Sequence, residues 1–251
     1  MKRLRPFLKF YGSKWRLAPK YPRPLHSTIC EPFAGSAAYS TLHHKCDVHL
    51  FDSWDWVVSL WRGLIDATEK DVRGLPGHRD LTPGQNLWDL DLPEWGVHLI
   101  GAWQRVGIND CRTVSKWNGL PGMWSSDVRD TIARQVGQIR HWQVDEADGM
   151  TVLSKSQDRS DVTWFIDPPY ESQPRVYRSQ GPDLERLARL CQHQAGQVIA
   201  CDLADATWLP FAPLAENTSG GARQGTSRAK KIEGIWTNDL TRPTNPVTMN
   251  L

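Results

Sequence analysis

The chain has 251 residues, long enough to bury the core of one large domain or of a domain that carries an insertion. Its 39% hydrophobic and 23% charged residues are typical of a soluble protein, no apolar run reaches the roughly 20 residues of a membrane span, and the N-terminus lacks the apolar stretch of a signal peptide. The net charge is only +2, but the first 24 residues hold eight lysines and arginines without one acid, which fits either a solvated face or a polyanionic partner.

Short apolar runs alternate with helical stretches along most of the chain. This alternation predicts an α/β fold, a Rossmann-like and mostly parallel sheet with helices on both faces. The expected strands, most of them buried on both faces, are residues 27–33, 47–52, 161–167, 196–202 and 231–238, and the expected helices are 34–45, 54–67 and 182–195.

Residues 68–143 interrupt this alternation. The segment is rich in Gly, Pro, Trp and Asn, and only its tail, residues 126–140, has a helical pattern. A structureless loop of this length is uncommon in a compact domain. We therefore interpret the segment as an inserted, mostly helical and irregular subdomain within a main domain formed by residues 1–67 and 144–251.

Three residues mark the ends of expected strands, where ligands bind in doubly wound sheets. Gly35 follows the first strand in a tight turn, Asp52 ends the second, and Asp167 ends a later one. A turn with a carboxylate some distance onward is typical of a nucleoside site. The turn "GSAAYS" lacks the glycine fingerprint that cradles the pyrophosphate of NAD. S-adenosylmethionine carries no phosphate and is consistent with the pattern.

The stretch "DPPY", Asp167 to Tyr170, combines a carboxylate with two stiff residues and an aromatic ring. Pro168 and Pro169 have fixed φ and no N–H group, so their carbonyls project rigidly from the strand end. A carboxylate beside such a carbonyl suits one –NH2 group, and Tyr170 offers a face on which a base could stack. The stretch therefore indicates transfer to an exocyclic amine.

Several segments, in this order, resemble the Dam-like class of S-adenosylmethionine-dependent DNA adenine-N6 methyltransferases, with the alpha-group order of motifs. The similarity covers most of the chain outside the insert. The segments are "FLKFYGSK" (7–14), "EPFAGSAA" (31–38), "FDSWDWVVSLW" (51–61), "VDEADGMTVL" (144–153), "DPPY" (167–170) and "RAKKIEGIWTN" (228–238).

The resemblance implies roles for individual residues. Asp52 would bind the ribose hydroxyls, Asp148 would lie by the cofactor adenine, and Asp167 would be shared between the cofactor and the target base. Ser13 and Ala37 depart from the pattern, each standing where the class often has glycine. The cofactor-binding residues implied are Phe10, Tyr11, Lys14, Glu31, Phe33, Gly35, Asp52, Asp148 and Asp167, and the catalytic ones are Asp167, Pro168, Pro169 and Tyr170.

The resemblance also implies double-stranded DNA as the partner, with the target adenine turned out of the stack. The insert would read the sequence. No metal site and no membrane contact are expected, the five cysteines form no CxxC pair and fit reduced thiols, and a cytoplasmic monomer in a bacterial or phage-infected cell is expected. The residues expected to contact DNA are Arg112 and Lys116 in the insert and Arg175, Tyr177 and Arg178 after DPPY.

Two other interpretations stay open. The same chemistry could act on cytosine N4 or on RNA, although an aspartate before PPY favours adenine. The chain could also be a DNA-binding protein that keeps the fold without turnover, although the intact DPPY, Lys14 and Asp52 favour an enzyme.

Overall fold

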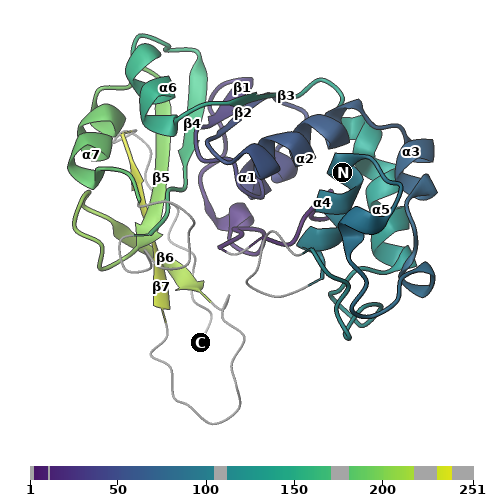
Figure 1. The fold of residues 1–251 in the computed structure, drawn as a ribbon. Helices are drawn as coiled ribbons and strands as arrows, with labels where there is room; N and C mark the ends of the chain where they lie inside the picture. The colour runs from purple at the N-terminus through teal and green to yellow at the C-terminus, as the bar shows by residue number, and fades with distance from the viewer. Residues whose placement is uncertain (1–2, 11, 105–111, 171–180, 218–230, 239–251) are drawn as a thin grey trace.

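The computed structural model describes residues 3–10, 12–104, 112–170, 181–217 and 231–238. Within these ranges a seven-stranded sheet is the centre of the protein (Figure 1). Its strands are β1 (Thr28–Glu31), β2 (Asp47–Asp52), β3 (Gln143–Glu146), β4 (Val162–Ile166), β5 (Gln197–Leu203), β6 (Ala212–Asn217) and β7 (Lys231–Thr237).

The strand order is β3-β2-β1-β4-β5-β7-β6. The first five strands of that order pair in parallel, whereas β7 runs antiparallel to both β5 and β6. The predicted α/β class with a mostly parallel sheet is therefore confirmed, and the order of β1 to β5 is compatible with a Rossmann-like fold. The order reverses between β1 and β4, so the carboxyl ends of these two strands flank the crevice where such sheets bind ligands.

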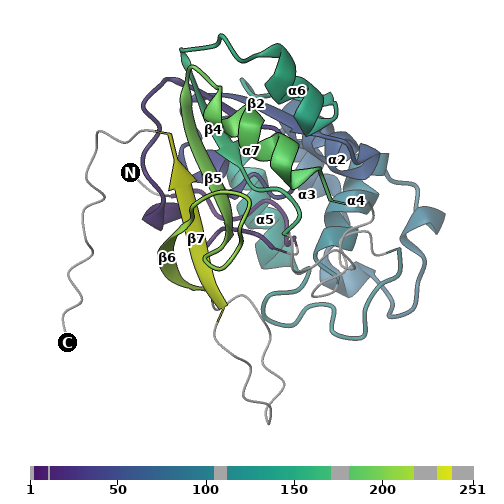
Figure 2. The same cartoon turned by 90° about the vertical axis from the view of Figure 1, so that its left-hand side faces the viewer.

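Helices cover both faces of the sheet, as Figures 1 and 2 show. Alternate residues of β4 face opposite sides: Trp164 belongs to a hydrophobic cluster with α6 and α7, whereas Phe165 belongs to a second cluster and stacks on Tyr39 of α1. The α-helices are α1 (Ala38–Leu42), α2 (Asp55–Asp66), α3 (Glu69–Gly74), α4 (Glu94–Ala102), α5 (Ser126–Val136), α6 (Gly149–Lys155) and α7 (Leu184–Gln192), and the short 3-10 helices are η1 (Ala18–Lys20), η2 (His78–Asp80), η3 (Leu87–Asp89) and η4 (Gly137–Ile139).

The edge strands differ from the sequence prediction. Strands β3 and β6 are not among the predicted ones, because β3 is a short polar edge strand, and β6 contains Pro213 and an irregular register between Pro213 and Ala215. Proline is tolerated at an edge because it has no N–H to give to a neighbouring strand. Helix α1 is also shorter than predicted, since it starts only after Ala37, whose φ is +43°.

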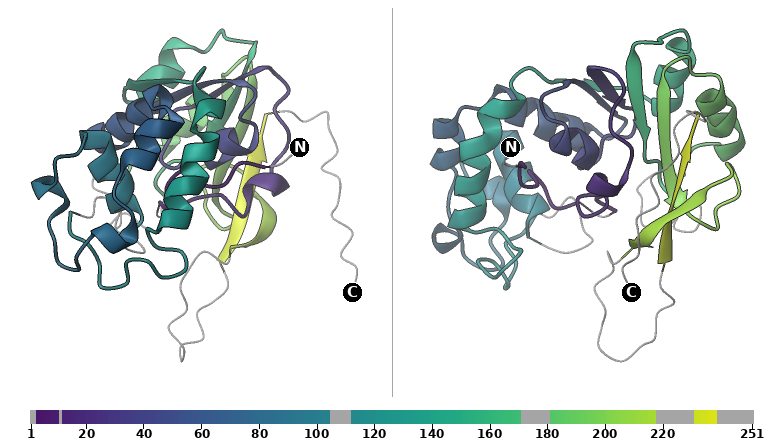
Figure 3. Two further views of the ribbon diagram at one scale, coloured as in Figure 1. Left: turned by 90° about the vertical axis from the view of Figure 1, so that its right-hand side faces the viewer. Right: turned by 180° about the vertical axis from the view of Figure 1, so that it is seen from behind.

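Residues 68–143 contribute α3, α4 and α5, which lie together beyond α2 on the side of the sheet away from α6 and α7 (Figure 3). Their buried side chains, among them Val72, Ile100 and Ile132, belong to the same hydrophobic cluster as Phe165 of the sheet. Helix α3 starts with a capping box between Thr68 and Asp71. That this segment is a separate recognition subdomain stays a prediction.

Candidate functional site

The N-terminal segment meets the DPPY stretch through an ion pair. Nζ of Lys14 lies 2.7 Å from Oδ1 and 2.9 Å from Oδ2 of Asp167, and it also donates to the carbonyl of Gly12 at 3.0 Å. The Lys14 side chain is buried, whereas 21% of the Asp167 side chain is exposed. Two of the residues predicted for one site are therefore in direct contact, and one of them keeps an open side toward a ligand.

Asp167 is placed by the strand that precedes it. Strand β4 is buried along its whole length between β1 and β5 and ends at Ile166, so the carboxylate follows at the carboxyl edge of the sheet. Pro168 and Pro169 cannot donate backbone hydrogen bonds and do not extend the ladder. The strand therefore stops just before its first charged side chain, Asp167.

A second carboxylate, Glu233 of β7, lies behind this ion pair. Its side chain is fully buried, and its Oε1 atom accepts hydrogen bonds from the hydroxyls of Tyr21 at 2.7 Å and Tyr170 at 2.5 Å. The same oxygen lies 3.9 Å from Nζ of Lys14. The sequence analysis did not single out Glu233. A lone acidic residue in the apolar run "KIEGIW" is the signal that could have found it, because buried charges are paired in folded proteins.

The ring of Tyr170 is not an open surface on which a base could stack directly. Its side chain is only 6% exposed, its hydroxyl binds Glu233, and its ring centroid lies 4.5 Å from Nζ of Lys14. A base could stack on this ring only after the ring is uncovered. The stacking role of Tyr170 stays a prediction.

The charges of the site are unevenly balanced, since one lysine stands between two carboxylates. Burial raises the pKa of Asp167 to about 6, against the opposing effect of Lys14, and the charge of Glu233 raises it further. Burial by itself would lower the pKa of Lys14, but the two carboxylates outweigh it and the pKa is raised. Lys14 is therefore protonated at neutral pH. Asp167 is a hydrogen-bond acceptor whose pKa, about 6, lies close to neutral pH.

The turn after β1 is held by Asp52. Oδ2 of Asp52 accepts from the N–H of Gly35 at 3.0 Å, and Oδ1 accepts from the N–H of Trp54 at 2.9 Å. Gly35 has φ +43°, and a Cβ there would lie 3.2 Å from the ring of Phe10. Glycine is therefore favoured by the backbone angle as well as by the neighbouring ring. Asp52, Gly35 and Phe10 thus form one group at this edge.

The N-terminal element is tied to the same turn. The hydroxyl of Ser36 donates to that of Ser13 at 2.9 Å, so the serine that departs from the Dam-like pattern makes a contact that glycine could not make. Through Ser13 and Lys14, adjacent residues of one segment reach both the turn after β1 and the end of β4. The structure thereby brings Phe10, Lys14, Gly35, Asp52 and Asp167 to one edge of the sheet.

Other predicted cofactor residues have structural partners of their own. Glu31 is buried, its Oε1 accepts from the N–H of Ser40 at 2.8 Å, and burial raises its pKa to about 8. Asp148 caps α6 by accepting from the N–H and hydroxyl of Thr151, both at 2.8 Å. Phe33 packs beside the start of α6, since a Cβ on Gly149 would lie 2.9 Å from its ring.

Of the residues predicted to contact DNA, two lie in the segment between α4 and α5, and the others fall outside the described residues. Arg112 and Lys116 are exposed between α4 and α5, and Nζ of Lys116 lies 4.9 Å from the ring of Trp117, itself 54% exposed. The structure does not bring them into contact with the DPPY stretch. Tyr11, Arg175, Tyr177 and Arg178 lie outside the described residues.

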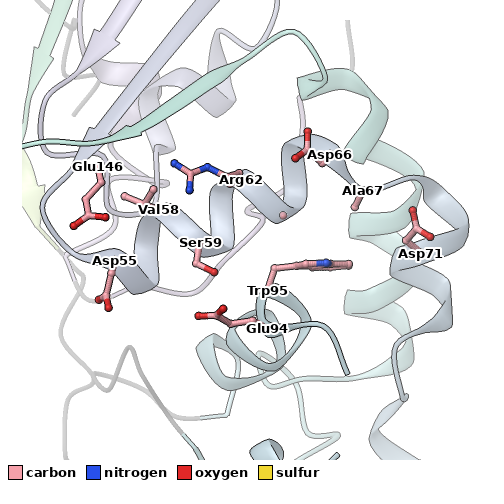
Figure 4. A pocket seen from close by; sticks show the side chains of 11 residues that line it. Asp55, Val58, Ser59, Arg62, Asp66, Ala67, Asp71, Glu94, Trp95 and Glu146 are labelled. Carbon is pink, nitrogen blue, oxygen red and sulfur yellow. The ribbon is translucent and has the colours of Figure 1, made fainter. Parts of the chain in front are cut away.

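A hollow of about 630 Å³ lies beside α2 and α4. Figure 4 shows the side chains that line it. Five carboxylates line it together with one arginine, so its charge repels phosphate. A second hollow, of about 730 Å³, lies at the start of α5 beside Arg79 and Leu120. The charged residues of the first hollow are Asp55, Arg62, Asp66, Asp71, Glu94 and Glu146.

Among the residues that the structure describes, no cluster of three or more His, Cys, Asp or Glu side chains could hold a metal ion. No helix in those ranges has the length and apolarity needed to cross a membrane. Cys30, Cys46, Cys191 and Cys201 are free thiols, and Cys111 lies outside the described ranges. Neither the models of known protein families nor the curated proteins contain a match to this chain.

Proposed function

We propose that this protein transfers a methyl group from S-adenosylmethionine to the N6 amine of adenine in DNA, at a specific short sequence. The observation that carries the proposal is the Lys14–Asp167 ion pair at the carboxyl edge of the sheet. It joins the N-terminal element to DPPY beside the turn held by Asp52. Motifs that resemble the Dam-like class, widely separated in sequence, thus converge where such a sheet binds its ligand.

The residues at this edge fit a nucleoside better than a nucleotide. Each oxygen of Asp52 accepts one backbone N–H, and a carboxylate has about four acceptor positions, which leaves capacity for ribose hydroxyls. Phe10 adds an aromatic face beside Gly35. Helix α1 has only five residues and no side-chain cap, and the turn has a single glycine, so nothing here resembles a phosphate cradle.

Asp167 and the carbonyl of Pro168 are the acceptors we assign to the target amine. S-adenosylmethionine, when bound, supplies a methyl group whose bonding electrons stay with the sulfur as the group leaves. Two hydrogen bonds from the amine to these fixed acceptors draw its lone pair out of conjugation with the ring. The nitrogen that gains the methyl group loses a proton. Asp167, with a pKa of about 6, is the neighbouring group suited to hold that proton before it passes to water.

A methyl-transfer assay tests this function directly. The protein is incubated with tritiated S-adenosylmethionine and mixed double-stranded DNA, and the DNA is then digested to nucleosides. We expect label in N6-methyl-2′-deoxyadenosine, and sequencing of modified bases should place it in one short motif. Label in N4-methylcytosine would change the target base. A folded protein that binds DNA and transfers no label to DNA, or to RNA in a parallel reaction, would be a silent binding protein, and the proposal would be wrong.

A further inference from the structure

Lys14 stands between the partly exposed carboxylate of Asp167 and the buried carboxylate of Glu233, but of the two it is hydrogen-bonded only to Asp167. A lysine ammonium has three donors. Nζ donates hydrogen bonds to Oδ2 of Asp167 and to the carbonyl of Gly12, and it makes an ion-pair contact with Oδ1 of Asp167. Oε1 of Glu233 lies 3.9 Å away, within ion-pair range but beyond hydrogen-bond length. A shift of Nζ by about 1 Å would bring that oxygen within the usual length of a charge-assisted hydrogen bond.

Glu233 is held in place from two sides. The hydroxyl of Tyr21, from the N-terminal segment, and that of Tyr170, from DPPY, both donate to its Oε1 atom. Strand β7 fixes the backbone of Glu233 by pairing with both β5 and β6. The carboxylate of Glu233 is therefore held in a fixed position as an acceptor, whereas the ammonium of Lys14 lies at the end of a flexible side chain and can move.

Lys14 contacts both oxygens of Asp167, so an amine that binds Asp167 must share the carboxylate with the ammonium. If Lys14 left Asp167 without gaining another close carboxylate, its buried ammonium would be only weakly paired, which is unfavourable. We propose that Glu233 is the second counter-ion of Lys14, and that Lys14 turns from Asp167 to Glu233 when an amine binds Asp167. The inference rests on the proposed function only for the identity of that amine, an exocyclic base amine.

The groups around Asp167 come from every neighbouring element. Removing the charge of Glu233 would take away one of the effects that raise the pKa of Asp167, and would leave Lys14 wholly to Asp167. Both changes lower that pKa. The charged and titratable groups that act on Asp167 are Lys14 and Tyr21 from the N-terminal segment, Glu31 from β1, Tyr170 from DPPY, Cys201 and Asp202 from β5, and Glu233 from β7.

The first test is a crystal structure of Asp167→Asn, in which residue 167 carries no charge. We expect Nζ of Lys14 to move from 3.9 Å to a distance of about 2.8 Å from Oε1 of Glu233. Asp158→Asn, an exposed residue in the turn before β4, is the control and should keep the wild-type geometry. If Nζ instead stays on residue 167 or turns to solvent, Glu233 is not its second counter-ion.

The second test measures the charge of Glu233 without any ligand. The Asp167 carboxyl is titrated by carbon-13 NMR in the wild type, in Glu233→Gln and in Tyr21→Phe. The glutamine variant should lower the titration midpoint by about one pH unit or more, the scale of a nearby charge. Tyr21→Phe removes one hydrogen bond but keeps the charge of Glu233, and its midpoint should stay close to wild type. A folded glutamine variant with an unchanged midpoint would overturn the inference.

The two tests remain informative whatever the methyl-transfer assay shows, because neither uses S-adenosylmethionine or DNA. If Glu233→Gln does not fold, the Asp167→Asn structure still decides the question. If the proposed function is wrong, a different amine binds Asp167. If these two tests fail, Lys14 does not exchange Asp167 for Glu233, whatever the amine is.

Discussion

Lys14 and Asp167 are 153 positions apart in the sequence, yet the Lys14 Nζ atom lies 2.7 Å from Oδ1 of Asp167. The pair links the segment before β1 to the end of β4. Because the lysine is buried and the aspartate is partly open, the pair has one side in the core and one at the sheet edge. A change in either residue should therefore affect both stability and the site.

Asp167→Ala should abolish methyl transfer, because the reacting amine loses its carboxylate acceptor. The variant should stay folded but lose roughly 1.5–3 kcal/mol of stability, the scale of hydrogen bonds to a charged group, since Glu233 is then the one carboxylate within ion-pair range of Lys14 among the described residues. Initial rates and urea unfolding measure the two effects. Asp158→Ala, in an exposed turn, is the matched control. Full activity of the Asp167 variant would end this mechanism.

Activity and stability should respond to pH in opposite directions around Asp167. Its pKa is raised to about 6 by burial, so activity should fall as pH drops through about 6 and the acceptor becomes protonated. A carboxyl whose pKa is raised on folding contributes stability that is full below about pH 4 and lost as pH rises through 6. The stability of the wild type relative to Asp167→Asn should therefore be greatest near pH 4. Rates and unfolding measured from pH 4 to 8 check both trends, and parallel trends would show that another group controls activity.

S-adenosylmethionine should raise the melting temperature, by an amount that corresponds to about 2.7 kcal/mol at a hundredfold excess over its Kd. NAD should not. Asp52→Ala should weaken this shift, because it removes the acceptor for the ribose hydroxyls and releases the N–H of Gly35. Asp55→Ala, exposed at the start of α2, is the control and should keep the shift. A larger shift with NAD would contradict the cofactor assignment.

Tyr170→Phe should be more active than Tyr170→Ala, because only the alanine variant loses a stacking face worth roughly 1–3 kcal/mol. The phenylalanine variant should still lose about 1–3 kcal/mol of stability, since buried Glu233 loses a donor. Tyr39→Phe removes a hydroxyl that donates to Pro22, away from this site, and should lose stability without losing activity. If both Tyr170 variants are equally inactive, stacking is not the main role of the ring.

Phosphate contacts and base contacts should be separable by mutation. The side chain of Arg3 stacks on Trp15, so exposed Arg5 is the better candidate for phosphate. Arg5→Ala should weaken binding to every DNA sequence and lower the salt slope by about one. Lys116→Ala should cost about 1–3 kcal/mol at one base pair. Binding is measured on the cognate site and its single-base variants, and a uniform loss for Lys116→Ala would show that it contacts only the backbone.

The local elements with strong patterns could be predicted from the amino-acid sequence. Strands β4 and β5 are mostly apolar and are buried along their whole length, and DPPY marks the end of β4, because proline cannot continue a ladder and a carboxylate ends the buried run. The strand-helix alternation was enough for the α/β class. Gly35 and Asp52 could also be identified from the sequence, since each stands at the end of an apolar run where a turn must follow.

Which of these strand ends share a site, and which residues lie behind them, follows only from the folded arrangement of the sheet. The site depends on contacts between segments that are distant in the sequence. These are the contacts of Lys14 with Asp167 and of Glu233 with Tyr21 and Tyr170. They follow from the order of the strands in the sheet, which cannot be predicted from local sequence patterns. Edge strands β3 and β6 bury little and so leave little hydrophobic signal. The acidic residue in the apolar run "KIEGIW" indicates a buried Glu233, but its partners Tyr21 and Tyr170 could not be predicted, because they come from two other parts of the chain.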